Sequence, residues 1–377
     1  MTDPAALAAP RTRDFMPLTG IDHVELYVGN AAQAAFFLTR AFGFREIAYA
    51  GLETGVRDRA SHVLAQGRIR LVLTGALDSA STIAAHQHRH GDGVKAIALG
   101  VPDADAAWQE ATDRGAHGLA EPHTIADDHG EVRVATIAAY GDTVHTFVQR
   151  DGYAGPFLPG YAPREGAAPE EPAADDMLLT IDHIVGNVDL GQMDEWVGFY
   201  ERVFGMTEIL RFAGEAISTE YSALMSKVVS DGSGRVKFPI NEPAEGRRRS
   251  QVDEYLEFYE GAGAQHLALA TRDIVGTVAE LRRRGVAFLA IPDSYYDDVP
   301  ARVGEIDESL QDLRRQGILV DRDDEGYMLQ IFTKPLGDRP TLFLEIIERH
   351  GARGFGEGNF KALFEAIERE QDKRGNL

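Results

Sequence analysis

The two halves of the sequence resemble each other, and this internal repeat constrains the fold more than any other feature. Four pairs of segments recur in the same order in the two halves: 20–30 with 180–189, 31–44 with 193–206, 90–116 with 260–286, and 140–150 with 339–349. The first pair reads GIDHVELYVGN and TIDHIVGNVD. Because β-rich and helical segments alternate within each half, the repeat predicts one α+β module used twice.

A stretch rich in proline and acidic residues separates the two halves. Residues 157–178 begin FLPGYAPREGAAPEEPAADD, with four prolines and few apolar side chains. Such a segment cannot bury enough surface to fold by itself and is typical of a linker. We therefore predict a flexible tail at 1–17, a first domain at 18–156, this linker, and a second domain at 179–377, which suits a chain of 377 residues.

Composition excludes several classes of function. The formal charge of −22 disfavours binding to nucleic acid or to an anionic membrane. The absence of cysteine excludes disulfides, zinc–thiolate sites, iron–sulfur clusters and a cysteine nucleophile. The apolar runs are too short to cross a bilayer, and the first residues lack the pattern of a secretory signal. We expect a soluble, cytoplasmic protein.

The repeat also allows the halves to be compared position by position. Superposing them makes three pairs of positions equivalent: His23 and His183, Ala96 and His266, and Thr146 and Glu345. Two imidazoles and one carboxylate, each from a different strand, suit Fe(II) and leave coordination positions open for substrate and O₂. A carboxylate inside the apolar run TLFLEIIER would be costly to bury without a partner. We predict one metal site, in the second half, and a structural or assembly role for the first half.

A second group of histidines is an alternative candidate for a metal site. His86, His88 and His90 follow one another in AAHQHRHGDG. Histidines four residues apart on a helix can chelate zinc. No acidic residue accompanies them, however, and they precede a glycine turn where solvated histidines are common. We interpret this group as an adventitious site at most.

The second half carries long, unusual segments that point to one family. They include IDHIVGNV (181–188), EYSALMSKVV (220–229), KFPINEP (237–243), GAGAQHLAL (261–269), the stretch 317–349 and GFGEGNFKALFEAIE (354–368). From about residue 180 onward the chain resembles the 4-hydroxyphenylpyruvate dioxygenase family, and the first half resembles it more loosely. The resemblance implies the vicinal-oxygen-chelate fold, with paired βαβββ units forming a half-open barrel in each domain and a C-terminal gating helix at 359–373.

The resemblance also implies an activity. His183, His266 and Glu345 would hold one Fe(II) per chain, and the iron centre itself, with no separate acid or base, would carry the catalysis. The 2-oxo acid of 4-hydroxyphenylpyruvate would bind the iron beside O₂ and yield homogentisate and CO₂, as in tyrosine and phenylalanine catabolism. A homo-oligomer, dimer or tetramer, is expected from the family.

An arylpyruvate pocket needs an apolar slot, uncharged polar groups and a lid that excludes water. The predicted ring-packing residues are Phe332, Phe343, Phe355, Phe360 and Phe364. The predicted polar residues are Ser222, Asn241, Gln251, Gln265, Gln330 and Asn359. Gln265 directly precedes a ligand, so strand alternation turns it away from the site unless the strand bulges there. Glycines at 354, 356 and 358 predict a hinge before the last helix.

Three alternatives remain. 4-Hydroxymandelate synthase shares ligands and substrate but hydroxylates the benzylic carbon; Asn241 and the phenylalanines at 332, 343 and 360 favour the dioxygenase. A metal-free binding module of the same superfamily would have lost its ligands, as the first half has. Extradiol ring-cleaving enzymes need basic catalytic residues near the iron that this sequence does not offer.

Overall fold

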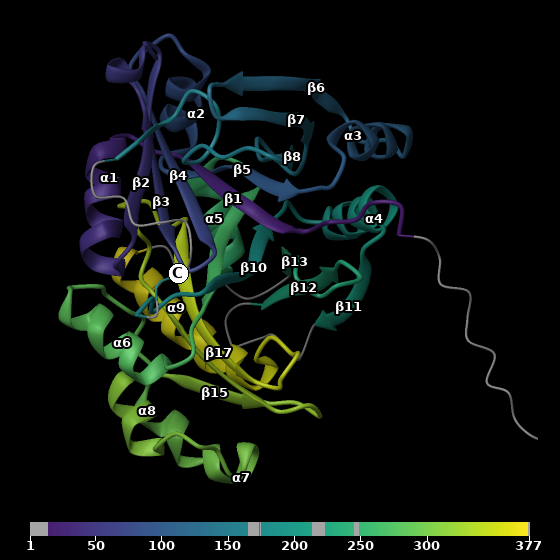
Figure 1. Cartoon of the computed structure of the whole chain (residues 1–377). Helices are drawn as coiled ribbons and strands as arrows, with labels where there is room; N and C mark the ends of the chain where they lie inside the picture. The colour runs from purple at the N-terminus through teal and green to yellow at the C-terminus, as the bar shows by residue number, and fades with distance from the viewer. Residues whose placement is uncertain (1–13, 165–172, 174, 213–222, 245–248, 376–377) are drawn as a thin grey trace, which may run out of the picture.

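A computed structural model describes residues 14–164, 173, 175–212, 223–244 and 249–375. The two halves form two curled sheets with helices packed against them, the first in the upper part of Figure 1 and the second in the lower part. Each sheet contains two βαβββ units joined through an antiparallel pair, β1 with β5 and β10 with β14. The predicted fold class, two tandem modules of this kind followed by a C-terminal helix, is confirmed.

The first sheet has the order β6-β7-β8-β5-β1-β4-β3-β2-β9. Its first unit comprises β1 (Gly20–Tyr27), α1 (Ala31–Phe37) with a π-helical turn at Leu38–Phe42, β2 (Arg45–Ala50), β3 (Arg59–Gln66) and β4 (Ile69–Ala76). Helix α2 (Thr82–His90) leads to the second unit, which comprises β5 (Gly93–Gly100), α3 (Ala104–Asp113), β6 (Gly118–Asp127), β7 (Gly130–Ala138) and β8 (Val144–Gln149).

The second sheet has the order β11-β12-β13-β10-β14-β17-β16-β15. Its first unit comprises β10 (Thr180–Asn187), α4 (Met193–Phe204), β11 (Thr207–Phe212), β12 (Ala223–Ser230) and β13 (Lys237–Ala244), followed by α5 (Gln251–Tyr259). Its second unit comprises β14 (Gly263–Ala270), α6 (Ile274–Arg283), α7 (Val299–Val303), α8 (Leu310–Gln316), β15 (Leu319–Arg322), β16 (Tyr327–Phe332) and β17 (Phe343–His350). Helix α9 (Phe360–Arg374) closes the chain.

The outer helices begin and end where the sequence supplies caps. Helices α3 and α6 occupy equivalent places, and the aspartates that precede them, Asp103 and Asp273, each accept a hydrogen bond from a backbone N–H in the first turn. Helix α4 ends at Gly205, whose φ of 66° is the left-handed value that glycine adopts most easily. Its apolar side, including Tyr200 and Val203, is buried.

The strand register reproduces the superposition predicted from the sequence. His23 pairs with Ala98, which pairs in turn with Thr146; the same row in the second half is His183, Ala268 and Glu345. The irregularities are shared too. In both halves, the residue immediately before the histidine of the first strand has no partner in the strand register. The residue immediately before Ala96, or before His266, has no partner either.

The predicted linker is partly a structural element of the first sheet. Phe157 is buried, with its ring centroid 5.0 Å from that of His23, and β9 (Ala162–Pro163) pairs with β2. Arg164 Nε donates to Glu46 Oε1 over 2.6 Å. Residues 157–164 of the predicted linker therefore pack against the first sheet through Phe157, β9 and one ion pair.

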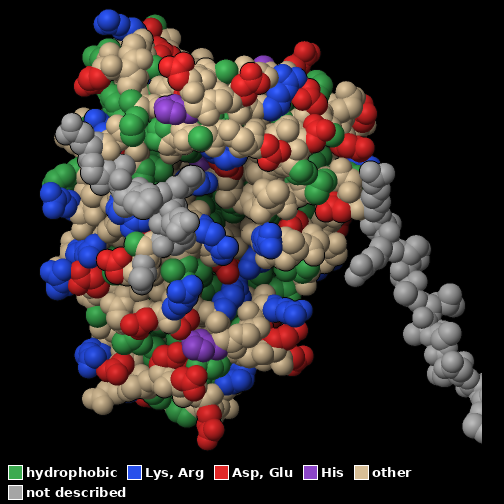
Figure 2. All heavy atoms as spheres, in the orientation of Figure 1, with side chains coloured by type: hydrophobic (Ala, Val, Ile, Leu, Met, Phe, Trp, Pro, Cys, Tyr) green, Lys and Arg blue, Asp and Glu red, His purple; other side chains and the backbone are tan. Residues whose placement is uncertain are grey.

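The surface charge is unevenly distributed. Lysine and arginine side chains gather in a hollow at mid-height of the face in Figure 2, between the two halves, although the chain as a whole is strongly acidic. Arg68, Arg235 and Lys237 line a groove where the two sheets meet. Within the described residues, no helix is long and apolar enough to cross a membrane.

We predict that Arg150→Met destabilises the fold by about 3 kcal/mol, because removing one partner strands a buried charge. Arg150 donates to both oxygens of the buried Asp22, over 2.8 and 2.6 Å. Burial opposes ionisation, yet His23 and Arg150 hold the pKa of Asp22 well below its usual range. The contribution is therefore fully present above the unfolded pKa of about 4 and is lost as the pH falls. Urea unfolding at several pH values measures it.

The matched control is Arg133→Met, which removes the exposed ion pair with Asp105. It should shift the urea midpoint little. Equal effects of the two substitutions at neutral pH would contradict the reading of Asp22 and Arg150 as a buried structural pair.

Candidate metal centre

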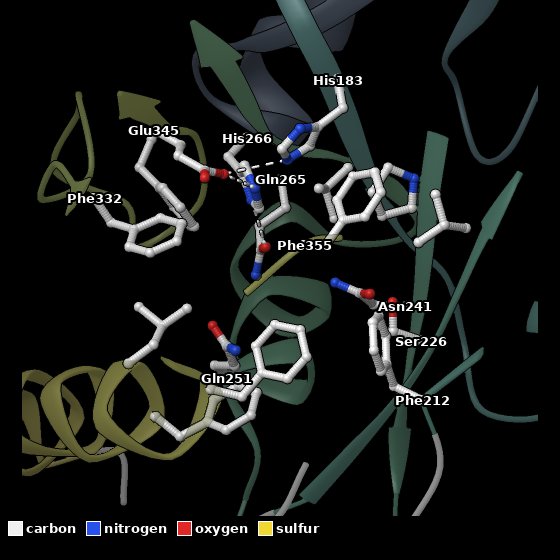
Figure 3. A pocket seen from close by; sticks show the side chains of 17 residues that line it. His183, Phe212, Ser226, Asn241, Gln251, Gln265, His266, Phe332, Glu345 and Phe355 are labelled. Atoms are coloured by element: carbon white, nitrogen blue, oxygen red, sulfur yellow. Dashed lines mark hydrogen bonds and ion pairs between the residues drawn. The ribbon is translucent and has the colours of Figure 1, made fainter. Parts of the chain in front are cut away.

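Three potential ligands converge at one end of a buried cavity, on the inner face of the second sheet (Figure 3). The Nε2 atoms of His183 and His266 lie 3.2 and 3.3 Å from the same carboxylate oxygen, Oε2 of Glu345. All three side chains are buried, and one potential ligand atom from each lies within 4.8 Å of the others. Two nitrogens and one oxygen facing a common point form a donor set for a divalent transition metal.

Strand register brings these side chains together. His183 on β10 and Glu345 on β17 lie opposite each other across β14, with Ala268 between them. The alanine methyl leaves room above it for both larger side chains to approach. His266 lies two residues before Ala268 on β14 and therefore projects from the same face.

Hydrogen bonds orient both imidazoles. Nδ1 of His183 lies 2.8 Å from Oδ1 of Asp182, and Nδ1 of His266 lies 3.0 Å from Oε1 of Gln265. Each ring thus donates through Nδ1 and keeps Nε2 as the free ligand atom. Arg349 donates to both oxygens of Asp182, over 2.8 and 2.9 Å, and fixes that carboxylate in turn.

The electrostatics of the three groups favour a cation between them. Burial acts against ionisation of Glu345, yet the two histidines lower its pKa to about 2. Burial also acts against protonation of His183, but Glu345 and Asp182 raise its pKa, whereas burial lowers the pKa of His266. One carboxylate charge therefore attracts positive charge into a pocket where one imidazole stays neutral, which is the state a metal ligand requires.

The cavity beside these ligands has mostly apolar walls. Eight predicted pocket residues line it: Asn241, Gln251, Gln265, Phe332, Phe343, Phe355, Phe360 and Phe364. Six lining residues were missing from the predicted pocket set: Val185, Phe212, Ser226, Val228, Pro239 and Leu363. Leu363 belongs to the apolar stripe of the last helix and could have been inferred. Val185, Ser226, Val228 and Pro239 lie in the segments that carry the family resemblance, whereas Phe212 carries no such signal.

Gln265 reaches the cavity because β14 bulges. Val185 pairs with His266, but the next pair joins Gly186 to Ala264, so Gln265 is the extra residue of β14. The bulge removes the conflict with strand alternation and lets consecutive side chains serve the same site.

Two predicted polar residues lie away from the cavity wall, and a third is not described. Gln330 and Asn359 are buried but do not line the cavity. Asn359 Oδ1 accepts a hydrogen bond of 2.6 Å from Tyr295, and Gln330 lies beneath Gly356, where a Cβ would come within 2.5 Å of its Nε2. Both residues therefore support the turn before α9 instead of the cavity wall. Ser222 lies outside the described residues.

The histidines of α2 form no comparable site. His86 and His90 are buried, so the expectation of solvated side chains was wrong for both. His90 is held by Asp142, 2.8 Å from its Nε2, and by the Tyr259 carbonyl oxygen, 2.5 Å from its Nδ1. Burial lowers the pKa of His86 to about 3. The rings of His86 and His90 therefore pack at the contact between the two halves.

Comparisons with known proteins decide the family. Residues 13–156 match the family model "Hydroxyphenylpyruvate dioxygenase, HPPD, N-terminal", and residues 180–331 match that of the glyoxalase/bleomycin resistance protein/dioxygenase superfamily. The chain is 47% identical to a 4-hydroxyphenylpyruvate dioxygenase of Aspergillus fumigatus over 95% of this chain and 94% of that protein. It is also 47% identical to one of Dictyostelium discoideum, over 96% and 100%. The chain belongs to the 4-hydroxyphenylpyruvate dioxygenase family.

A solved structure supports both fold and family. A triple mutant of 4-hydroxymandelate synthase from Streptomyces coelicolor superposes with a TM-score of 0.86 at 36% identity, covering 94% of this chain and all of the other. The dioxygenase family and this synthase therefore share one architecture, and the choice of reaction must lie in the side chains of the cavity.

We predict that Asp182→Asn weakens binding of a divalent metal about 10- to 100-fold, the usual cost of losing an orienting partner of a histidine ligand. Anaerobic competition for Fe(II) against a chromogenic chelator measures the dissociation constant. Asp22→Asn makes the same substitution in the first half, where the ligands are absent, and should leave metal affinity unchanged. Equal losses in both variants would show that the effect comes from general destabilisation.

Proposed function

We propose that this protein is an Fe(II)-dependent dioxygenase that converts 4-hydroxyphenylpyruvate and O₂ to homogentisate and CO₂. The observation that carries the proposal is the convergence of His183, His266 and Glu345 at the end of a cavity built for an aromatic ring. Close similarity over nearly the whole chain to proteins of that name supports the choice of substrate.

The three ligands would hold one Fe(II) at the end of the cavity. When bound, the iron supplies the redox chemistry that joins both atoms of O₂ to the substrate as its carboxyl group leaves. The protein's task is to present the imidazole nitrogens and the carboxylate oxygen already oriented and nearly free of water. Asp182 and Gln265 perform that orientation as positioning residues.

The two ends of the cavity differ in chemistry, and this difference can orient an arylpyruvate. The triad lies at one end, while Gln251, Asn241 and Ser226 lie toward the other (Figure 3). A 2-oxo acid directed to the metal would leave the phenol hydroxyl near these uncharged groups, which can donate and accept hydrogen bonds without a bare charge. The phenylalanines between them would clamp the ring and exclude water.

Helix α9 would serve as the lid. Phe360, Leu363 and Phe364 form part of the cavity wall from one side of this helix. The turn before it contains Gly356, whose φ of 77° is a backbone conformation that residues other than glycine rarely adopt. A hinge at this turn would let the helix move as a unit.

The first half would serve structure and assembly. It offers His23 but an alanine and a threonine at the other ligand positions. We infer domains from residue 18 and from residue 179, and a cytoplasmic homo-oligomer in which the metal-free half contributes contact surface. The rival activity is that of 4-hydroxymandelate synthase, favoured by the likeness to that enzyme's structure.

The first experiment incubates Fe(II)-loaded protein with 4-hydroxyphenylpyruvate and ascorbate under air and identifies the aromatic product by chromatography. We expect homogentisate. Glu345→Ala and His266→Ala should reduce turnover to background and keep the circular-dichroism spectrum, because they remove metal ligands from a sheet that remains intact. Hydroxymandelate as the product would establish the rival, and near-normal iron-dependent turnover in either variant would contradict the ligand assignment.

A second prediction concerns the phenol end of the cavity. Asn241→Leu should lower kcat/KM about 10- to 100-fold, the value of one or two hydrogen bonds to substrate. It should also raise the share of benzylic product, because the ring would lose the group that fixes its distance from the metal. Phe212→Leu, which changes only apolar bulk in the same wall, should not produce benzylic product. An unchanged product ratio in Asn241→Leu would remove Asn241 from substrate orientation.

A further inference from the structure

A second group of potential ligands lies at the far end of the strand that carries Glu345. His350 ends β17, Glu348 precedes it by two residues, and Glu308 comes from the loop between α7 and α8. One nitrogen, Nε2 of His350, lies 3.0 Å from Oε1 of Glu348 and 3.0 Å from Oε1 of Glu308. Among the described residues, this trio and the triad of the metal centre are the two groups whose ligand atoms converge in this way.

The cluster holds two carboxylates against one imidazole. A single Nε2 can donate one hydrogen, so it cannot fully satisfy two carboxylates at once. Oε2 of Glu308 is buried and accepts no hydrogen bond within the described part of the chain. Burial and the charge of Glu308 raise the pKa of Glu348, while His350 and the backbone N–H of Ile274 act in the opposite direction. Even with His350 protonated, two carboxylates and one imidazolium leave one negative charge unbalanced.

The equivalent position in the first half shows whether the negative charge of Glu348 is needed for its structural role. Oε2 of Glu348 accepts a hydrogen bond of 2.7 Å from the N–H of Ile274, the first residue of α6. At the equivalent place in the first half, Oε1 of Gln149 accepts one of 3.0 Å from Ala104, the first residue of α3. An uncharged amide therefore suffices to cap this helix. The structural role of Glu348 does not explain its charge.

The spacing of the ligand atoms suits a metal ion. Two atoms at about 2.1 Å from a metal and at right angles to each other lie about 3.0 Å apart. The separations around His350 have that value, which is also that of a hydrogen bond, and those within the triad are only slightly longer. The ring of Tyr327 stacks on His350 at 4.4 Å and fixes its plane. His350 remains partly exposed, so an ion can reach the site from solvent.

We propose that Glu308, Glu348 and His350 form a second divalent-metal site, which takes a first-row transition ion such as Zn²⁺, Mn²⁺ or Co²⁺. Two carboxylates and a neutral imidazole balance a charge of +2, and the mixed oxygen and nitrogen donors disfavour Ca²⁺ and Mg²⁺. The bound ion ties the loop at 304–309 to the end of β17 and so stabilises the second domain. It stands apart from the cavity, since none of its ligands lines that cavity.

Cobalt tests the site because its visible absorption reports ligand geometry. The full chain carrying His266→Ala and Glu345→Ala, freed of metal with a chelator, should still bind one Co²⁺ per chain and gain thermal stability on binding. Adding Glu348→Gln should raise the dissociation constant for Co²⁺ by more than about tenfold. That substitution keeps the helix cap, as Gln149 does in the first half, so the protein should stay folded.

Two controls make the outcome decisive. His88→Ala, which changes the exposed histidine of α2, should leave Co²⁺ binding intact; loss of binding there would assign the ion to α2 and overturn the proposal. Absence of saturable Co²⁺ uptake, or uptake indifferent to Glu348→Gln, would overturn it as well. If the background variant does not fold, the chain with its triad intact should bind two equivalents of Co²⁺, and one after Glu348→Gln.

Discussion

The register of three strands is the constraint on which the rest of this structure depends. Ala268 must pair with His183 on one side and with Glu345 on the other, since only this row brings two large ligands together over one small side chain. A slip of one residue in either pair would turn a ligand to the opposite face of the sheet. The bulges beside His183 and His266 follow from the same requirement, because they aim Asp182 and Gln265 at the rings that those residues orient.

The first half shows which parts of this arrangement are structural in their own right. It lacks two of the ligands, yet it keeps Asp22 against His23, Arg150 on Asp22, and an aromatic ring, Phe157, edge-on to the histidine. The second half has Asp182, His183, Arg349 and Phe355 in the same relation. The aspartate–arginine pair joins the first strand of a half to the end of its last strand across the strand between them. It stabilises the sheet whether or not a metal is present, and a metal centre needs only two further side chains on this support.

Features that recur in both halves could be predicted from the sequence. Positions that depend on the packing of a single side chain could not. The two sheets, the pairs of equivalent strands and the three converging side chains all follow from matching the halves. The bulge at Gln265 could not be inferred, because alternation alone places that side chain on the wrong face. Gln330 was expected in the pocket chiefly from the family resemblance, and Asn359 was expected there with it; both lie under the turn before α9, a position that depends on packing. Glu308 lies forty positions from Glu348 in the sequence, so no spacing could have joined them.

Packing of the last helix connects the cavity to the core. One side of its apolar stripe, with Phe364, packs against Phe212 and Phe355; the other, with Leu363, packs against Leu289 and Phe332. Arg374 also pairs in two places with the nearly buried Glu254 of α5. Opening the helix would therefore expose several rings at once and break a charged pair, so the open state is disfavoured when the cavity holds only water. In the proposed lid movement, a ring bound between the same side chains would add contacts that exist only in the closed state, so substrate binding and exclusion of water would become one equilibrium.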